Sequence, residues 1–185
     1  MEQAVPKTYC TYVQTLSKEN VHKIYHDTEY GFPLLNDNEL FARLVLEINQ
    51  AGLSWDTILK KKTNFFAAYD QFEIAIVANY GELKFNELMQ NAGIIRNRLK
   101  INAAIENAKT ILTIQKEHGS FKNWIELHHP LTKQEWVKLF KKHFRFTGGE
   151  IVNEFLMSTG YLPGAHTADC PVHKKVAKLK PKWMQ

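Results

Sequence analysis

The residues best suited to chemistry lie between residues 46 and 62, where an acid flanks the apolar face of a predicted helix. That face is an apolar stripe, with helical spacing, of Leu40, Leu44, Ile48 and Ala51. Glu47 lies on its flank, Gly52 then breaks the helix, and Ser54 can cap a second helix that starts with Trp55. Glu47 is either half exposed at the edge of the stripe or the floor of a pocket walled by Trp55. In a pocket, the carboxylate would need a partner or lose free energy by desolvation.

Two cysteines and two histidines form a second candidate group. Cys10 is followed by His26, and His166 precedes Cys170 by four positions, so each end of the chain carries one thiol and one imidazole. Two Cys and two His complete a tetrahedral zinc shell. The spacing also allows two buried free thiols or a disulfide, and His173 is a spare imidazole. Such a zinc site would be closed and structural, because no coordination position remains open for water.

A turn between two helical patterns is the third candidate. Gly93 lies within the segment 90–96, and a glycine there frees the backbone for a hairpin between helices. The N–H groups that open the second helix suit a phosphate oxygen, and the basic residues after the turn add attraction. Those residues are Arg96, Arg98 and Lys100. The alternative is a simple turn between packed helices.

Four aromatic side chains form the last candidate group: Tyr12, Tyr25, Tyr30 and Trp55. Aromatic residues are most often part of a core. An enzyme that acts on a nucleobase, however, must take it out of the stack and hold it between flat apolar surfaces. The sequence therefore leaves both a core and a base-binding role open for these rings.

The elements that must position these residues are helical. The periodicity predicts an all-α, compact single domain over residues 1–185, with a loose basic tail from about 175 to 185. Helices are expected at about 37–50, 54–69, 73–80, 82–91, 96–118, 132–143 and 151–159.

The composition is that of a globular protein, with 44% hydrophobic residues in 185. Residues 1–7 lack the apolar segment of a signal peptide, and no run of 18 apolar residues occurs, so we expect a cytoplasmic protein with no membrane partner. The formal net charge of +5 permits a polyanionic partner without requiring one.

Four sequence blocks resemble 3-methyladenine DNA glycosylase I, a bacterial base-excision repair family, and occur in family order between about residues 10 and 170. They are Tyr25-His26-Asp27-Thr28-Glu29-Tyr30-Gly31, Leu46 to Lys61, Asn91 to Arg98, and Gly160-Tyr161-Leu162 followed by His166 and Cys170. The resemblance implies a helix-hairpin-helix glycosylase fold. It also implies a structural zinc on Cys10, His26, His166 and Cys170.

The resemblance assigns roles to single residues as well. Glu47 and Tyr25 would be catalytic, and the base-binding residues would be Trp55, Tyr12, Tyr30 and His22. The DNA-binding residues would be Leu53, Gly93, Ile94, Arg96, Arg98 and Lys100. Tyr12 and Tyr30 stand where the family usually has Trp, His22 where some members have Tyr, and Ile48 and Asn49 depart from the usual pair. These departures bear on substrate preference more than on the reaction type.

The expected activity is hydrolysis of the N-glycosidic bond of 3-methyladenine in alkylated double-stranded DNA by base flipping, with free 3-methyladenine as product. No lysine has the setting of a Schiff-base nucleophile, so we expect a monofunctional enzyme that does not cleave the DNA strand. We also expect it to be a monomer. The alternatives are a glycosylase for another modified base and a non-catalytic module that binds damaged DNA.

Overall fold

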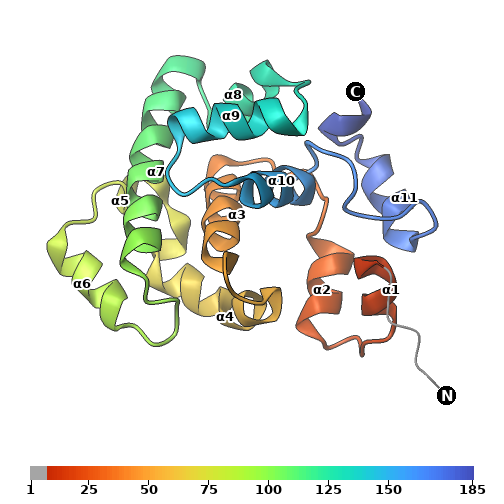
Figure 1. The fold of residues 1–185 in the computed structure, drawn as a ribbon, viewed down its shortest axis with the longest axis horizontal. Helices are drawn as coiled ribbons and strands as arrows, with labels where there is room; N and C mark the ends of the chain where they lie inside the picture. The colour runs from red at the N-terminus through yellow and green to blue at the C-terminus, as the bar shows by residue number, and fades with distance from the viewer. Residues whose placement is uncertain (1–7) are drawn as a thin grey trace. The chain divides into compact units, whose positions relative to one another are not determined.

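The structure, a computed structural model, describes residues 8–185, and its secondary structure is entirely helical (Figure 1). Residues 1–7, which the sequence analysis examined for a signal peptide, lie outside the described residues. The α-helices are α1 Tyr9–Gln14, α2 Val21–Thr28, α3 Asp37–Gln50, α4 Trp55–Ala68, α5 Ile74–Val77, α6 Glu82–Gln90, α7 Arg98–His118, α8 Phe121–His128, α9 Lys133–His143, α10 Gly149–Ser158 and α11 Pro171–Lys178. Two short 3₁₀ helices are η1 Asp70–Phe72 and η2 Lys182–Met184. The all-α prediction is confirmed for the described residues.

Side-chain caps set the helix boundaries near the candidate site. Asn36 caps α3 by accepting a hydrogen bond from the Glu39 N–H, and Ser54 caps α4 as predicted. The helix expected from about residue 96 begins at Arg98 because Asn97 is its N-cap. None of the described helices is both long and apolar enough to cross a membrane.

The described chain forms two compact units. The first comprises the described residues up to Pro33 together with Leu156–Gln185, and the second is Leu34–Phe155. Helix α10 runs through the boundary at Phe155. That the whole chain acts as one domain stays a prediction.

The second unit is built around α3, which packs against α4, α7 and α8. The fully buried side chains of this unit include Leu40, Phe41, Leu44, Ile48, Ile58, Phe65, Phe72, Phe121, Trp136 and Phe140. Asp37 fixes the start of α8, since its carboxylate accepts hydrogen bonds from the N–H groups of Phe121 at 2.8 Å and Lys122 at 3.0 Å. The first turn of α3 is therefore joined to the start of α8.

The first unit brings the two ends of the described chain together. Cys10 and Cys170 form a small buried cluster with Val172 and Val176, against which Phe32 packs. The expected loose tail from about residue 175 is a correction: α11 continues to Lys178, and Val176 is only 3% exposed. Burial of Val176 stabilises α11 within the first unit.

Candidate functional site

Glu47 lies in the third turn of α3 and is only 4% exposed, so the half-exposed alternative is wrong. Burial raises the pKa of Glu47 to about 8. Arg43, one helical turn earlier and itself buried, opposes this increase by favouring the charged carboxylate. The negative charge of Glu154 adds to the increase. At neutral pH the isolated protein therefore keeps most of its Glu47 carboxyl groups protonated.

The break after α3 is a tight turn, residues 51–54, which we call the Gly52 turn. Gly52 has φ of +79°, a conformation that L side chains rarely adopt. The Leu53 N–H donates to the Gln50 carbonyl at 2.7 Å, and the Gln50 amide donates back to the Leu53 carbonyl at 3.1 Å. This turn leaves Leu53 39% exposed and makes Trp55 the first residue of α4. In the second unit, Glu47 and Trp55 thus lie on either side of one hydrogen-bonded turn.

The first unit gathers the other predicted base-binding residues. Tyr25, Tyr30 and His22 are 3%, 8% and 8% exposed, whereas Tyr12 is 37% exposed. The Tyr25 and Tyr30 rings lie 5.5 Å apart, and the Tyr12 and His22 rings 5.6 Å apart. All four therefore belong to one aromatic cluster, with Tyr12 at its exposed edge.

Tyr9 links this cluster and was missed by the sequence analysis. Its hydroxyl lies 3.0 Å from His22 Nδ1, and its ring centre lies 5.6 Å from those of Tyr30 and His26. The available signal was its position one residue before Cys10 and one helical turn before Tyr12.

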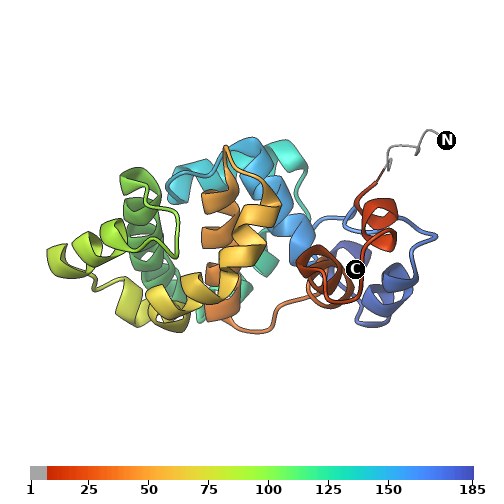
Figure 2. The same ribbon diagram turned by 90° about the horizontal axis from the view of Figure 1, so that it is seen from below.

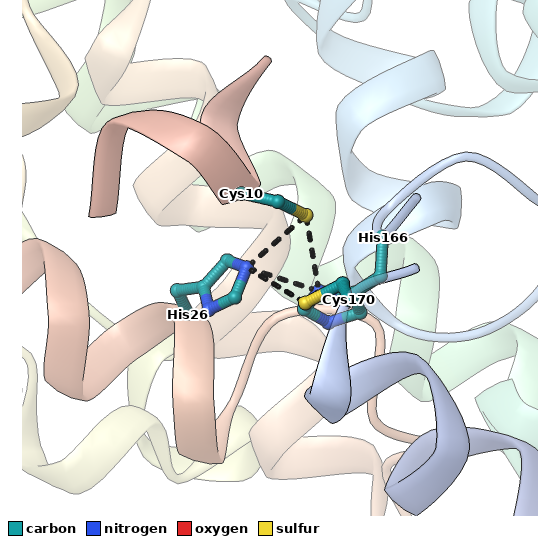
Figure 3. Close-up of side chains that lie close together, drawn as sticks. All are labelled: Cys10, His26, His166 and Cys170. Atoms are coloured by element: carbon teal, nitrogen blue, oxygen red, sulfur yellow. Dashed lines mark hydrogen bonds between the residues drawn. The ribbon is translucent and has the colours of Figure 1, made fainter. Parts of the chain in front are cut away.

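The four predicted metal ligands converge within the first unit, and Figure 3 shows their side chains pointing toward one another. His26 Nε2 lies 3.3 Å from Cys10 Sγ, 3.8 Å from Cys170 Sγ and 3.1 Å from His166 Nδ1. His166 Nδ1 lies 3.8 Å from Cys10 Sγ and 3.9 Å from Cys170 Sγ. All four residues are buried, and both thiols are free. The group can hold a metal ion, and the disulfide alternative is not present.

The remaining ring nitrogens of the two histidines have partners of their own. His26 Nδ1 lies 2.7 Å from the Asp27 carboxylate, and His166 Nε2 lies 2.7 Å from the Tyr30 carbonyl. Such bonds orient the nitrogen that faces the metal. Gly31 allows the close approach, because a Cβ there would meet Ala165 at 2.7 Å and the His166 ring at 3.3 Å.

The turn between α6 and α7 lies beside α4 in both ribbon views (Figures 1 and 2). Two side chains of α4 hold it: Lys61 Nζ donates to the Ala92 carbonyl at 2.9 Å, and the Asn64 amide donates to the Gly93 carbonyl at 3.4 Å. Within the turn, the Gly93 N–H donates to Asn91 Oδ1 at 2.8 Å. Arg96 and Arg98 are exposed, and the Arg98 guanidinium lies 5.1 Å from the Phe85 ring centre.

Two residues that were expected to contact DNA have buried side chains. Lys100 is 5% exposed and donates to carbonyls at the end of α3, and the Ile94 side chain is 3% exposed. Two N–H groups that open α7, those of Leu99 and Lys100, already donate to Asn97 Oδ1. Of the three basic residues predicted to contact DNA, Arg96 and Arg98 are exposed and Lys100 is buried.

The burial of Glu47 gives a prediction for stability. Protonated Glu47 contributes stability that is fully present below its ordinary pKa of 4.5 and is lost as pH rises through about 8. Glu47→Gln cannot ionise, so it should match the wild type near pH 5 and exceed its stability by a few kcal/mol at pH 9. Chemical denaturation at pH 5, 7 and 9 measures this difference. Glu106→Gln, at an exposed carboxylate, is the control, and a Glu47→Gln difference that does not widen with pH would contradict the prediction.

The family model described as methyladenine glycosylase matches residues 15–139. The DNA-3-methyladenine glycosylase of Haemophilus influenzae is 34% identical over 89% of this chain and 97% of its own length. DNA-3-methyladenine glycosylase 1 of Escherichia coli is 33% identical over 84% of this chain and 92% of its own length.

A solved structure of 3-methyladenine DNA glycosylase I from Staphylococcus aureus, determined to explain its recognition of 3-methyladenine, is 31% identical. It superposes with a TM-score of 0.76 over 84% of this chain and 93% of that one. Sequence and fold agree over most of the chain, and the protein belongs to the methyladenine glycosylase family.

Proposed function

We propose that this protein is a monofunctional DNA glycosylase that flips 3-methyladenine out of alkylated double-stranded DNA and hydrolyses its N-glycosidic bond. The observation that carries the proposal is the buried carboxyl group of Glu47 within a family motif. The two units would act together as one glycosylase domain. We further propose that it works as a monomer in the bacterial cytoplasm, on nucleoid DNA.

Recognition of the base rests on charge. Methylation at N3 makes the adenine cationic, so the glycosidic bond is already activated and the enzyme must mainly select and hold the cation. A cation beside Glu47 lowers the pKa of the carboxyl group, which gives up its proton as the base binds. The resulting carboxylate accepts from the exocyclic amine and offsets the positive charge. A neutral purine lacks this attraction and leaves Glu47 protonated.

The aromatic residues would complete recognition. Trp55 adds cation–π stacking, worth roughly 0.5–2 kcal/mol. Tyr25 hydrogen-bonds the base edge, and Tyr12, Tyr30 and His22 contribute the remaining base-binding surface. Water then attacks the sugar, and no lysine is assigned a covalent role.

Excision tests this proposal directly. Glu47→Gln should slow release of 3-methyladenine from methylated DNA by about 100-fold, because the amide keeps the shape but cannot become anionic. Wild-type excision should increase as pH rises toward 8, and the variant should lose this dependence. Trp55→Ala should weaken binding of the free base through lost stacking. Single-turnover release, followed by chromatography of the freed bases, measures all three.

Glu106→Gln, an exposed neutralisation in the same unit, should retain wild-type excision. Chromatography also identifies the base that is released. Release of a different modified base would support the alternative substrate, and absence of any release with retained DNA binding would support the non-catalytic module.

Zinc is the metal we propose for the Cys10, His26, His166 and Cys170 group. With zinc bonds of about 2.0–2.3 Å, tetrahedral ligands lie roughly 3.3–3.8 Å apart. The pairs that include a His26 or His166 nitrogen lie 3.1–3.9 Å apart, close to this range. Two thiols with two imidazoles also form one of the common structural donor sets. The ion would stabilise the first unit and take no part in hydrolysis.

Removal of one ligand should therefore release the metal and destabilise the fold. Cys170→Ser should abolish the one zinc per chain and cost on the order of 3 kcal/mol, or roughly 6–12 °C in Tm. His173→Ala, close in sequence but outside the group, should keep its zinc. Elemental analysis and thermal unfolding measure both effects. A Cys170→Ser protein that retains one equivalent of zinc would refute the assignment.

DNA binding would use the turn between α6 and α7 as a helix-hairpin-helix element. Gly93 and the backbone at Ile94 approach the phosphates, Arg96 and Arg98 add attraction, and the exposed Leu53 contacts the opened duplex. The support is the exposure of Arg96, Arg98 and Leu53, together with the anchoring of the turn by Lys61. Contacts of this kind position DNA without reading its sequence.

Arg96→Ala should weaken binding to damaged and undamaged duplex alike and reduce the salt slope by about one. Lys116→Ala is the matched control, because Lys116 is an exposed cation in the last turn of α7, about 27 Å from its start. Fluorescence anisotropy across a salt series measures both slopes. Equal slopes for the wild type and Arg96→Ala would show that Arg96 does not contact phosphate.

A further inference from the structure

The buried ammonium of Lys100 has an unusual pair of partners. Its Nζ donates to the carbonyl of Asn49 at 2.9 Å and to the carbonyl of Ala51 at 2.6 Å. Lys100 lies in the first turn of α7, and its backbone N–H donates to Asn97 Oδ1 at 3.2 Å. The side chain thus joins the start of α7 to the end of α3.

The two carbonyls belong to the last turn of α3 and its C-cap, where helices leave carbonyl groups without intrahelical partners. A cation at this end also interacts favourably with the helix dipole. Lys100 therefore supplies donors to two carbonyl groups at the end of α3, of which that of Asn49 is buried.

The place where α3 ends decides the spacing of the two recognition residues. Ala51 lies one helical turn after Glu47 and opens the Gly52 turn, which leads through Ser54 to Trp55. Lys61 holds the turn before α7 against α4 through the Ala92 carbonyl. A closed circuit of contacts thus runs from α3 through the Gly52 turn and α4 to the α6–α7 turn, and back through Lys100.

The same contacts leave Lys100 poorly suited to bind phosphate. Two of its three N–H donors are used, and its Nζ lies 5.9 Å from the centre of the Phe146 ring. Burial also lowers the pKa of Lys100. An ammonium enclosed in this way is a structural donor.

We propose that Lys100 is a positioning residue for base recognition, which acts by clamping the end of α3 and thereby setting the Gly52 turn between Glu47 and Trp55. The inference rests on the proposed function, because it assigns Lys100 to the same base-binding site. It replaces the phosphate contact that the sequence predicted for this lysine.

The test compares Lys100→Met, which keeps the length of the side chain but removes its donors, with Lys116→Met as the matched control on α7. Three quantities are measured on each folded protein: affinity for free 3-methyladenine by calorimetry, single-turnover excision, and the salt slope for undamaged duplex. Lys100→Met should lose about tenfold or more in base affinity and in excision rate, with a wild-type salt slope. Lys116→Met should keep wild-type base affinity and excision.

Two results would overturn the inference. Wild-type base affinity and excision in Lys100→Met would show that the clamp does not position the site. A salt slope reduced to that of Arg96→Ala would show that Lys100 contacts phosphate after all.

Lys100→Arg supplies a second variant should Lys100→Met fail to fold, since it keeps charge and donors while changing their geometry. Lys100→Arg should fold and recover only part of the base affinity. Full recovery would show that the site does not require the geometry of the lysine ammonium. The wild-type measurement separates the two proposals. If the wild type does not bind free 3-methyladenine, the proposed function fails, whereas normal wild-type binding with unaffected Lys100 variants refutes the clamp alone.

Discussion

The rest of the site depends on the burial of one ionisable group, Glu47. Its carboxyl group occupies a place where water cannot stabilise a charge, so the folded protein favours the neutral form. Arg43, buried one turn away on α3, offsets only part of this effect. An added cation beside such a carboxyl group stabilises its charged form. The surroundings of Glu47 therefore favour a positively charged ligand. The preference for a cation and the loss of folding stability at high pH thus have the same physical origin, the burial of Glu47.

A buried charge is useful only if its position is fixed, and the second unit provides this with backbone carbonyl groups. Lys100 binds those at the end of α3, and Lys61 binds one in the turn before α7. Both contacts join segments that are far apart in sequence. Both use lysine side chains, which would ordinarily be expected at the surface. Part of the positive charge of the chain therefore serves internal architecture, whereas Arg96 and Arg98 are exposed.

Helical phase predicted α3 and placed Glu47 at the edge of its buried face, and the cap at Ser54 predicted where α4 begins. Helical phase does not predict how deeply a side chain is buried, because the burial of Glu47 depends on packing partners from distant segments of the chain. The same limit applies to Lys100 and Val176, whose burial does not follow from their place in the sequence. Helices α1, α2, α8 and α11 were not predicted individually, since each is too short to show a clear period. The Cys and His group was predicted by residue type, whereas its assembly needed the fold.

The first unit is discontinuous in sequence, and this has a consequence for how the chain folds during synthesis. Cys10 and His166 are 156 residues apart, so the entropy of closing a very long loop opposes their meeting. The second unit is one continuous segment and can form while the chain is still being made. The first unit must wait for the residues that follow Leu156. During that interval Cys10 and His26 lack their partners His166 and Cys170. Assembly of the four-residue group therefore requires that translation has passed Cys170.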